Sequence, residues 1–222
     1  MTQWTPTARR RASSVDADRL LSDAAQTPLG GPRGNARLTG ATAAVLLALL
    51  AAEGLTVLQV ESLLTPHVVI GMVLVPFVVV KICTTGWRMV EYYRGDPAYR
   101  ARGAPPILLR LLGPVVVLLT LLLFASGIAL LVVPHSLRQG MMFLHKASFV
   151  LWFGAMTIHV LGHVLETSRL APADLVSRTR SQVRGAGIRL WVQSACLVVG
   201  IVLAVVVAPT VGPWLAGGGV GG

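Results

Sequence analysis

Five long apolar blocks, separated by more polar stretches, dominate the pattern of this sequence. They cover approximately residues 38–60, 66–90, 111–133, 141–165 and 190–208. A helix needs about 20 apolar residues to cross the hydrocarbon core of a bilayer. In lipid, a helix satisfies its own backbone hydrogen bonds. The pattern therefore predicts an all-α fold, an integral membrane bundle of five transmembrane helices.

Composition agrees with a membrane protein. Of the 222 residues, 54% are hydrophobic and only 13% are charged, whereas a soluble domain is usually about 25% charged. The mean hydropathy is +0.71. The tails differ from the blocks in composition. We expect residues 1–37 to be a disordered basic cytoplasmic tail, residues 38–208 to be the transmembrane domain, and residues 209–222 to be a flexible Gly-rich tail outside the cell.

The net charge of +10 would also suit a nucleic-acid-binding protein, but nearly all arginines lie in the stretches on one side of the predicted membrane. One group precedes the first block, a second lies at or between the second and third, and a third lies between the fourth and fifth. These groups are Arg9, Arg10, Arg11, Arg19, Arg33 and Arg37; Arg88, Arg94, Arg100, Arg102 and Arg110; and Arg169, Arg178, Arg180, Arg184 and Arg189. On the opposite side, only Arg138 lies outside the blocks. This positive-inside pattern predicts a multi-pass protein of the plasma membrane, with the N-terminus in the cytoplasm and the C-terminus outside. Its basic side is expected to face lipid headgroups, and no nucleic acid partner is expected.

Two histidines mark the candidate site. His67 begins the second block and His145 lies near the start of the fourth. Both helices run from outside to inside, so the two imidazoles lie at similar depth. Two imidazoles facing each other across a bundle can take both axial positions of a haem iron. A lone membrane histidine can also be a packing residue that forms a hydrogen bond.

A second pair of candidates lies deeper. His159 follows His145 by fourteen residues, which on a straight helix places both on one face about 21 Å apart. Lys81 follows His67 by the same fourteen residues. This spacing predicts an inner haem with His159 and Lys81 as iron ligands. His163, one turn beyond His159, could instead be a ligand or hold a propionate.

The choice of lysine matters for this prediction. Only Lys81 and Lys146 are lysines, and both lie inside blocks, whereas the other basic residues are arginines. A desolvated lysine can lose its proton and offer a lone pair, which arginine does not. The alternative for Lys81 is snorkelling towards Arg88 or pairing with a propionate.

Three further residues belong to the predicted outer site. Lys146 and Glu53 lie in the outer halves of their blocks. We expect either an ion pair between them or a contact from Lys146 to a haem propionate, because isolated charges in a membrane are costly. Gly71 lies one turn from His67, where a missing side chain would let a flat macrocycle approach the backbone. Close helix packing explains the glycine equally well.

Two segments carry a family resemblance. LHKASFVLWFGAMTIHVLGH (residues 144–163) resembles the haem-bearing helix of bacterial membrane cytochromes b. GWRMVEYYRGDPAYRARGAPP (residues 86–106) resembles the cytoplasmic loop of an actinobacterial group of such proteins. The resemblance covers residues 37–165. It implies electron transfer with quinone or with a redox partner at the membrane, for which a molybdopterin oxidoreductase is one candidate. Di-haem members usually use four histidines, and Lys81 departs from that pattern.

Together these observations predict a membrane b-type cytochrome that carries electrons across the plasma membrane through one or two b haems. The sequence lacks Cys-x-x-Cys-His, which excludes covalent haem attachment. Loops such as residues 166–189 are too short for a catalytic domain, so an electron-transfer subunit of a larger respiratory complex is expected rather than a stand-alone enzyme. The alternatives are a haem-free transporter or proton pathway, and a structural membrane anchor.

Overall fold

The computed structural model describes residues 6–104 and 107–216, and these residues form helices and connecting turns. Five helices are long and apolar enough to cross a membrane. They are α2 (Gly31–Leu58), α3 (Leu64–Arg94), α5 (Ile107–Val132), α6 (His135–Leu170) and α8 (Ala186–Val207). The predicted all-α bundle of five long apolar helices is thus confirmed.

Six further helical elements complete the described chain. They are α1 (Pro6–Ala25), α4 (Pro97–Ala101), η1 (Ala171–Asp174), α7 (Ser177–Arg180), η2 (Ala208–Val211) and α9 (Gly212–Ala216). Three of them lie at the two ends of the described chain, where tails were expected. Residues 6–25 form α1, which packs against α2 and α4, and residues 208–216 form η2 and α9. Residues 1–5 and 217–222 of those tails lie outside the described residues.

The first long helix begins earlier than the hydropathy pattern predicts. Gly30 adopts a left-handed conformation, with φ of 78°, just before α2, and a proline follows within the first turn. Proline suits that position because the first backbone N–H groups of a helix have no partner inside it. Local chain geometry, rather than apolar length, therefore sets the start of α2.

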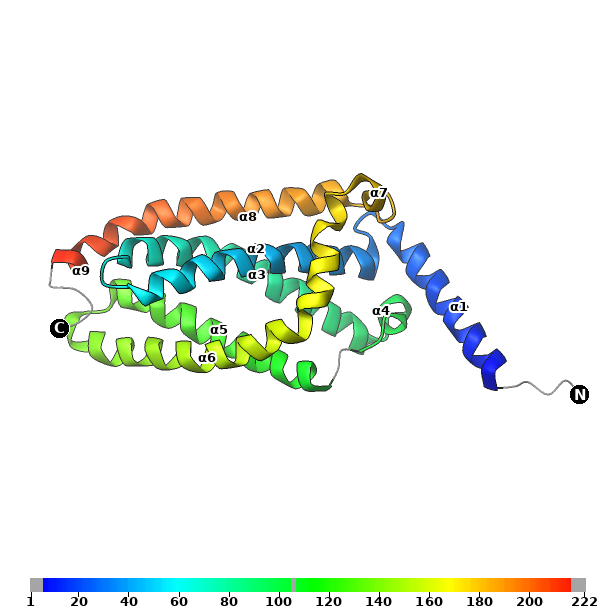
Figure 1. Ribbon diagram of the computed structural model, residues 1–222, viewed down its shortest axis with the longest axis horizontal. Helices are drawn as coiled ribbons and strands as arrows, with labels where there is room; N and C mark the ends of the chain where they lie inside the picture. The colour runs from blue at the N-terminus through cyan, green and yellow to red at the C-terminus, as the bar shows by residue number, and fades with distance from the viewer. Residues whose placement is uncertain (1–5, 105–106, 217–222) are drawn as a thin grey trace, which may run out of the picture.

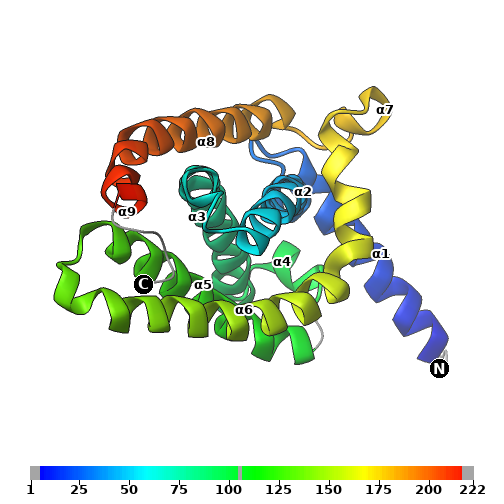
Figure 2. The same ribbon diagram turned by 60° about the vertical axis from the view of Figure 1, so that its left-hand side comes forward.

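The long helices pack as pairs, with α2 against α3, α3 against α8, and α5 against α6. Figure 1 shows them lying side by side along the long axis, and Figure 2 shows α8 on the far side of α3 from α5 and α6. A small core of Leu46, Leu74, Phe77 and Cys196 joins α2, α3 and α8. A Cβ on Gly200 would come within 2.9 Å of the backbone of Val73, so this glycine lets α8 approach α3 closely.

One end of the bundle carries residues 95–104 and 171–185, and we call it the arginine end. The other carries the turn at residues 59–63 together with α9, and we call it the histidine end. At the arginine end, Asp174 is buried. It accepts hydrogen bonds from Arg37 at 3.2 Å and from Nη2 of Arg189 at 2.7 Å. These charge-assisted bonds join α2, η1 and α8.

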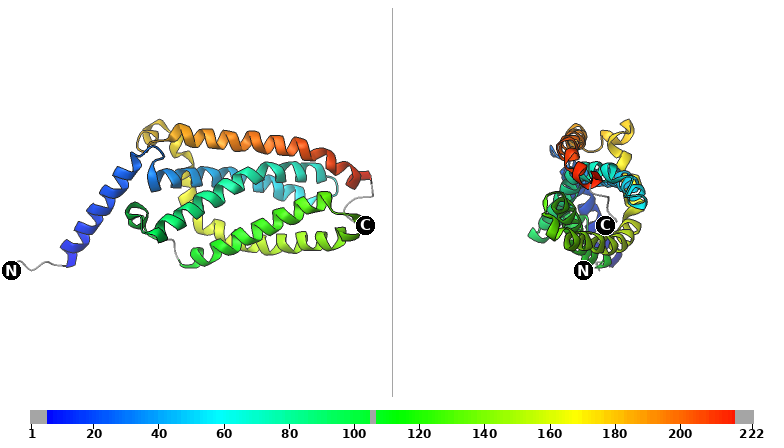
Figure 3. Two further views of the ribbon diagram at one scale, coloured as in Figure 1. Left: turned by 180° about the vertical axis from the view of Figure 1, so that it is seen from behind. Right: turned by 90° about the vertical axis from the view of Figure 1, so that its left-hand side faces the viewer.

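Helix α6 turns near the arginine end. Figures 1 and 3 show its last part, in yellow, running across the end of the bundle towards α7. This part crosses α2 closely, since a Cβ on Gly40 would meet Cβ of Leu170 at 2.7 Å. The bend carries the last part of α6 across the bundle instead of along it.

Candidate functional site

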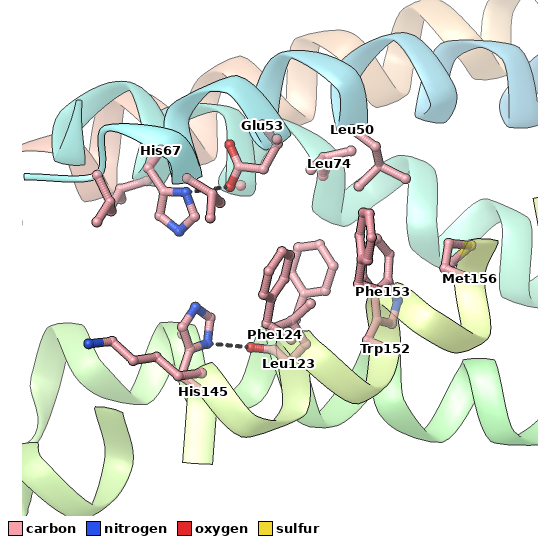
Figure 4. Close-up of a pocket in the computed structure, with 18 of the residues that line it drawn as sticks. Leu50, Glu53, His67, Leu74, Leu123, Phe124, His145, Trp152, Phe153 and Met156 are labelled. Atoms are coloured by element: carbon pink, nitrogen blue, oxygen red, sulfur yellow. Dashed lines mark hydrogen bonds and ion pairs between the residues drawn. The ribbon is translucent and has the colours of Figure 1, made fainter. Parts of the chain in front are cut away.

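A cavity of about 740 Å³ lies between the α2–α3 pair and the α5–α6 pair. Its wall is largely apolar, and Figure 4 shows side chains from both pairs pointing into it. At the histidine end, η2 and α9 contribute Val211 and Trp214 to the lining. The Trp214 ring lies 4.4 Å beneath the guanidinium carbon of Arg138. This cation–π contact holds α9 against the start of α6.

The structure places His67 of α3 and His145 of α6 opposite each other across this cavity (Figure 4). Their ring centroids are 6.4 Å apart, and the ring planes are nearly perpendicular, at 81°. The sequence argument expected these two imidazoles at similar depth, and the structure brings them together.

Each ring is held through its Nδ1 atom. Nδ1 of His67 lies 3.0 Å from Oε1 of Glu53 and 3.1 Å from Oγ1 of Thr56. Nδ1 of His145 lies 3.2 Å from the carbonyl oxygen of Leu123 and 3.1 Å from Oγ of Ser126. With a proton on Nδ1, each ring donates to an oxygen and keeps a lone pair on Nε2. Figure 4 shows these Nε2 atoms directed into the gap between the rings.

The gap fits one metal ion. A metal bound by an imidazole nitrogen at about 2 Å on each side separates the two nitrogens by about 4 Å, and each ring centre lies roughly 1 Å behind its nitrogen. The sum agrees with the observed 6.4 Å between the ring centroids of His67 and His145. Among the described residues no three His, Cys, Asp or Glu side chains converge to hold a lone metal ion. A pair of imidazoles on an apolar cavity instead suits a metal whose remaining ligands come from a macrocycle.

Two glycines flank the paired histidines. A Cβ on Gly127 of α5 would lie 3.0 Å from Cε1 of His145, so this glycine makes room for that ring. A Cβ on Gly71, which lines the cavity, would meet only Oε1 of Glu53, at 3.6 Å. Gly71 thus lies in the cavity wall next to Glu53, and its role beside a macrocycle stays a prediction, whereas Gly127 was not foreseen.

The expected ion pair between Glu53 and Lys146 is wrong. Glu53 pairs with His67 and is contacted by Thr56, and within the described chain Lys146 makes no ion pair. Glu53 lies on α2, which packs against α3, and its carboxyl group contacts the ring of His67 on α3 instead of Lys146 on α6. Lys146 nevertheless lines the cavity, and its contact with a propionate stays a prediction.

Aromatic side chains form the cavity wall below the histidines. Trp152 is buried, and its Nε1 donates a hydrogen bond of 2.9 Å to Oγ1 of Thr120 on α5. Phe149 stacks on Trp152, with ring centroids 6.4 Å apart. The indole N–H of Trp152 therefore has its hydrogen-bond partner within the protein. The side chains of Trp152 and Phe149 line the cavity with apolar surface.

The deeper candidates have different surroundings. Nζ of Lys81 donates to the carbonyl of Thr39 at 3.3 Å. The rings of His159 and His163 are 4.9 Å apart, and Nδ1 of His163 lies 3.6 Å from Glu166. Nδ1 of His159 is buried and has no hydrogen-bond partner among the described residues. These residues do not line the cavity, and their assignment as inner haem ligands stays a prediction.

No family model, curated protein or solved structure matches this chain. The site is therefore interpreted from its geometry. Sequence reasoning missed the roles of Thr56, Ser126 and the Leu123 carbonyl beside the two rings. The two hydroxyl residues lie in apolar blocks near the depth of the histidines, which is the signal that could have found them.

Proposed function

We propose that this chain is a membrane b-type cytochrome with a haem b held between His67 and His145. The observation that carries the proposal is the pair of facing imidazoles, 6.4 Å apart, in an apolar cavity. Haem, when bound, supplies a one-electron couple. His67 and His145 would hold this group through Nε2, and their Nδ1 partners would fix the tautomer that leaves Nε2 available.

The surrounding side chains support the same function. The apolar wall excludes water, which keeps the local dielectric low and tunes the potential of a bound redox group. Lys146 is the cavity-lining cation, so it is our candidate for pairing with a propionate. Gly71 and Gly127 leave space beside the two ligand helices.

We further propose the orientation that the arginine distribution favours. The arginine end would face the cytoplasm and its lipid headgroups, and the histidine end would lie on the outer side of the bacterial plasma membrane. Electrons would then pass between quinone or a redox partner protein and the haem near the outer surface. A larger respiratory complex would supply any substrate chemistry.

An optical spectrum tests the haem directly. Purified protein reduced with dithionite should show sharp Soret and alpha bands of six-coordinate haem b. His67→Ala and His145→Ala should each abolish these bands, while His135→Ala, a change at an exposed histidine, should leave them intact. A colourless wild-type protein from iron-replete cells would instead favour a haem-free transporter, a proton pathway or a structural anchor.

A further inference from the structure

Arg138 has an unusual position among the arginines of this chain. It lies outside the apolar blocks on the side that carries His67 and His145, while the other arginines lie towards the opposite side. Cytoplasmic loops of membrane proteins are rich in arginine, and the loops on the other side contain far less of it. The presence of an arginine at the histidine end therefore needs a local explanation.

The side chain lies at the mouth of the cavity. Arg138, Met142 and His145 follow one another at spacings of four and three residues, so they share one face of α6. Met142 and His145 line the cavity, and Arg138 lies two turns from His145, about 10.5 Å along the helix axis. The guanidinium carbon of Arg138 is 4.4 Å from the ring centroid of Trp214, which also lines the cavity.

The Nε–H group of Arg138 lacks an acceptor. Nε is buried and has no hydrogen-bond partner in the part of the chain that the structure describes. Of the acidic residues at this end, Glu53 pairs with His67 and Glu61 is exposed in the turn at residues 59–63. The Trp214 ring attracts the cation through its face, but the N–H groups lie in the guanidinium plane and still need an oxygen acceptor. A buried cationic donor without an acceptor is costly, and an anionic group on a bound molecule would remove that cost.

The wall of the cavity is unequal along its length. Towards the arginine end it consists of side chains such as Leu47, Met156 and Leu161, which offer no partner to a charge. Haem is an apolar macrocycle with a pair of propionate carboxylates on one edge. Carboxylates directed towards the arginine end would lose their water without gaining a counter-charge, whereas the histidine end offers cations.

We infer that Arg138 binds a carboxylate of the haem and so orients the macrocycle with its propionates towards the histidine end. This inference rests on the proposed haem between His67 and His145. The planar guanidinium can donate two parallel hydrogen bonds to one carboxylate. Lys146 stays the candidate partner of the other propionate, and Trp214 holds the guanidinium in place from its face.

The test separates recognition of the carboxylate from ligation of the iron. Full-length protein from haem-starved cells would be titrated with iron-free protoporphyrin IX and with its dimethyl ester, which has the same macrocycle without the charges. Porphyrin fluorescence gives both dissociation constants. Arg138→Gln should bind protoporphyrin IX about tenfold more weakly than the wild type and bind the ester equally well. Equal losses for the two porphyrins, or no loss for either, would overturn the inference.

The control is Arg178→Gln, which removes an exposed arginine at the arginine end and should leave both affinities unchanged. A similar selective loss in this variant would assign the effect to net charge and overturn the inference. If Arg138→Gln folds poorly, the wild type alone still decides, because it should bind protoporphyrin IX more tightly than the ester. Haem in the purified wild type together with equal affinities for the two porphyrins would defeat this inference alone. A wild-type protein without haem from iron-replete cells would defeat the proposed function.

Discussion

The histidine end and the arginine end of the same helices carry similar residue types in very different surroundings. At the histidine end, His67 and His145 point their Nε2 atoms across a cavity, and each Nδ1 has an oxygen partner. Towards the arginine end, Lys81 is bonded to a backbone carbonyl, and His159 has a buried Nδ1 without a partner among the described residues. Equal spacing along the chain predicted two comparable sites. Two ligands of one metal also need a cavity between them, and each imidazole needs a hydrogen-bond partner on its other ring nitrogen. His67 and His145 have both.

The direction of α6 also differs between the two ends. Its last part runs across the bundle and contacts α2 (Figure 3). His163 accordingly pairs with Glu166 on the same helix, and Glu166 lies 3.0 Å from Arg102 of the α4–α5 connection. These contacts suit a role in fixing the arginine end.

Removing a ligand should have the largest effect. We expect His145→Ala to lose essentially all haem, because a buried axial position would be left without a nitrogen. The pyridine haemochrome assay on purified protein measures this. Helical content by circular dichroism should stay at the wild-type level, since the ring lies against a cavity and not in the core. A wild-type haem content in this variant would contradict the assignment of His145 as a ligand.

Crowding a ligand should have an intermediate effect. In Gly127→Ala the new methyl group would lie 3.0 Å from Cε1 of His145, so the ring or α5 must shift. We expect a loss of haem affinity of about tenfold, or about 1.4 kcal/mol, in competition with a haem scavenger such as apomyoglobin. The control is Gly154→Ala on α6, where a Cβ meets nothing within 4 Å. Equal affinities in the two variants would contradict the close packing of His145.

Loosening the closure at the histidine end should have a smaller effect. Trp214 lines the cavity and packs under Arg138. Both side chains are half-buried, and a cation–π contact contributes about 0.5–2 kcal/mol. We expect Trp214→Ala to speed haem transfer to apomyoglobin a few-fold without changing the haem content at purification. Trp191→Ala is the control, because this tryptophan of α8 is 72% exposed and does not line the cavity. A slower transfer from the Trp214 variant would overturn the assigned closure.

Changes at the deeper residues should have the smallest effect if the structural comparison holds. Lys81→Ala and His159→Ala would remove the predicted inner ligands but leave His67 and His145 unchanged. We expect the haem-to-protein ratio to remain at the wild-type value in both. A fall to half that value in either variant would instead establish a second haem at this depth, as the spacing argument predicted.

The sequence alone was sufficient for the five long helices, because long apolar blocks have few alternatives in lipid. It was also sufficient to place the rings of His67 and His145 near each other, since both residues lie near the outer ends of helices that run in the same direction. It failed for Glu53. Charge complementarity favoured Lys146 as the partner of Glu53, whereas the structure pairs Glu53 with His67. The choice between these partners depends on the rotation of α2 and α3 about their axes, and hydropathy carries no information on that rotation. The bend in α6 was also missed, because α6 contains no proline that would mark it and the close crossing of α6 and α2 at Gly40 is a contact that hydropathy does not show.

The haem content of the purified wild-type protein, set against that of a His67→Ala, His145→Ala double variant, tests the central claim most directly. The account predicts one haem b per chain in the wild type and none in the double variant. A wild-type protein without haem, or a double variant with undiminished haem, would contradict it.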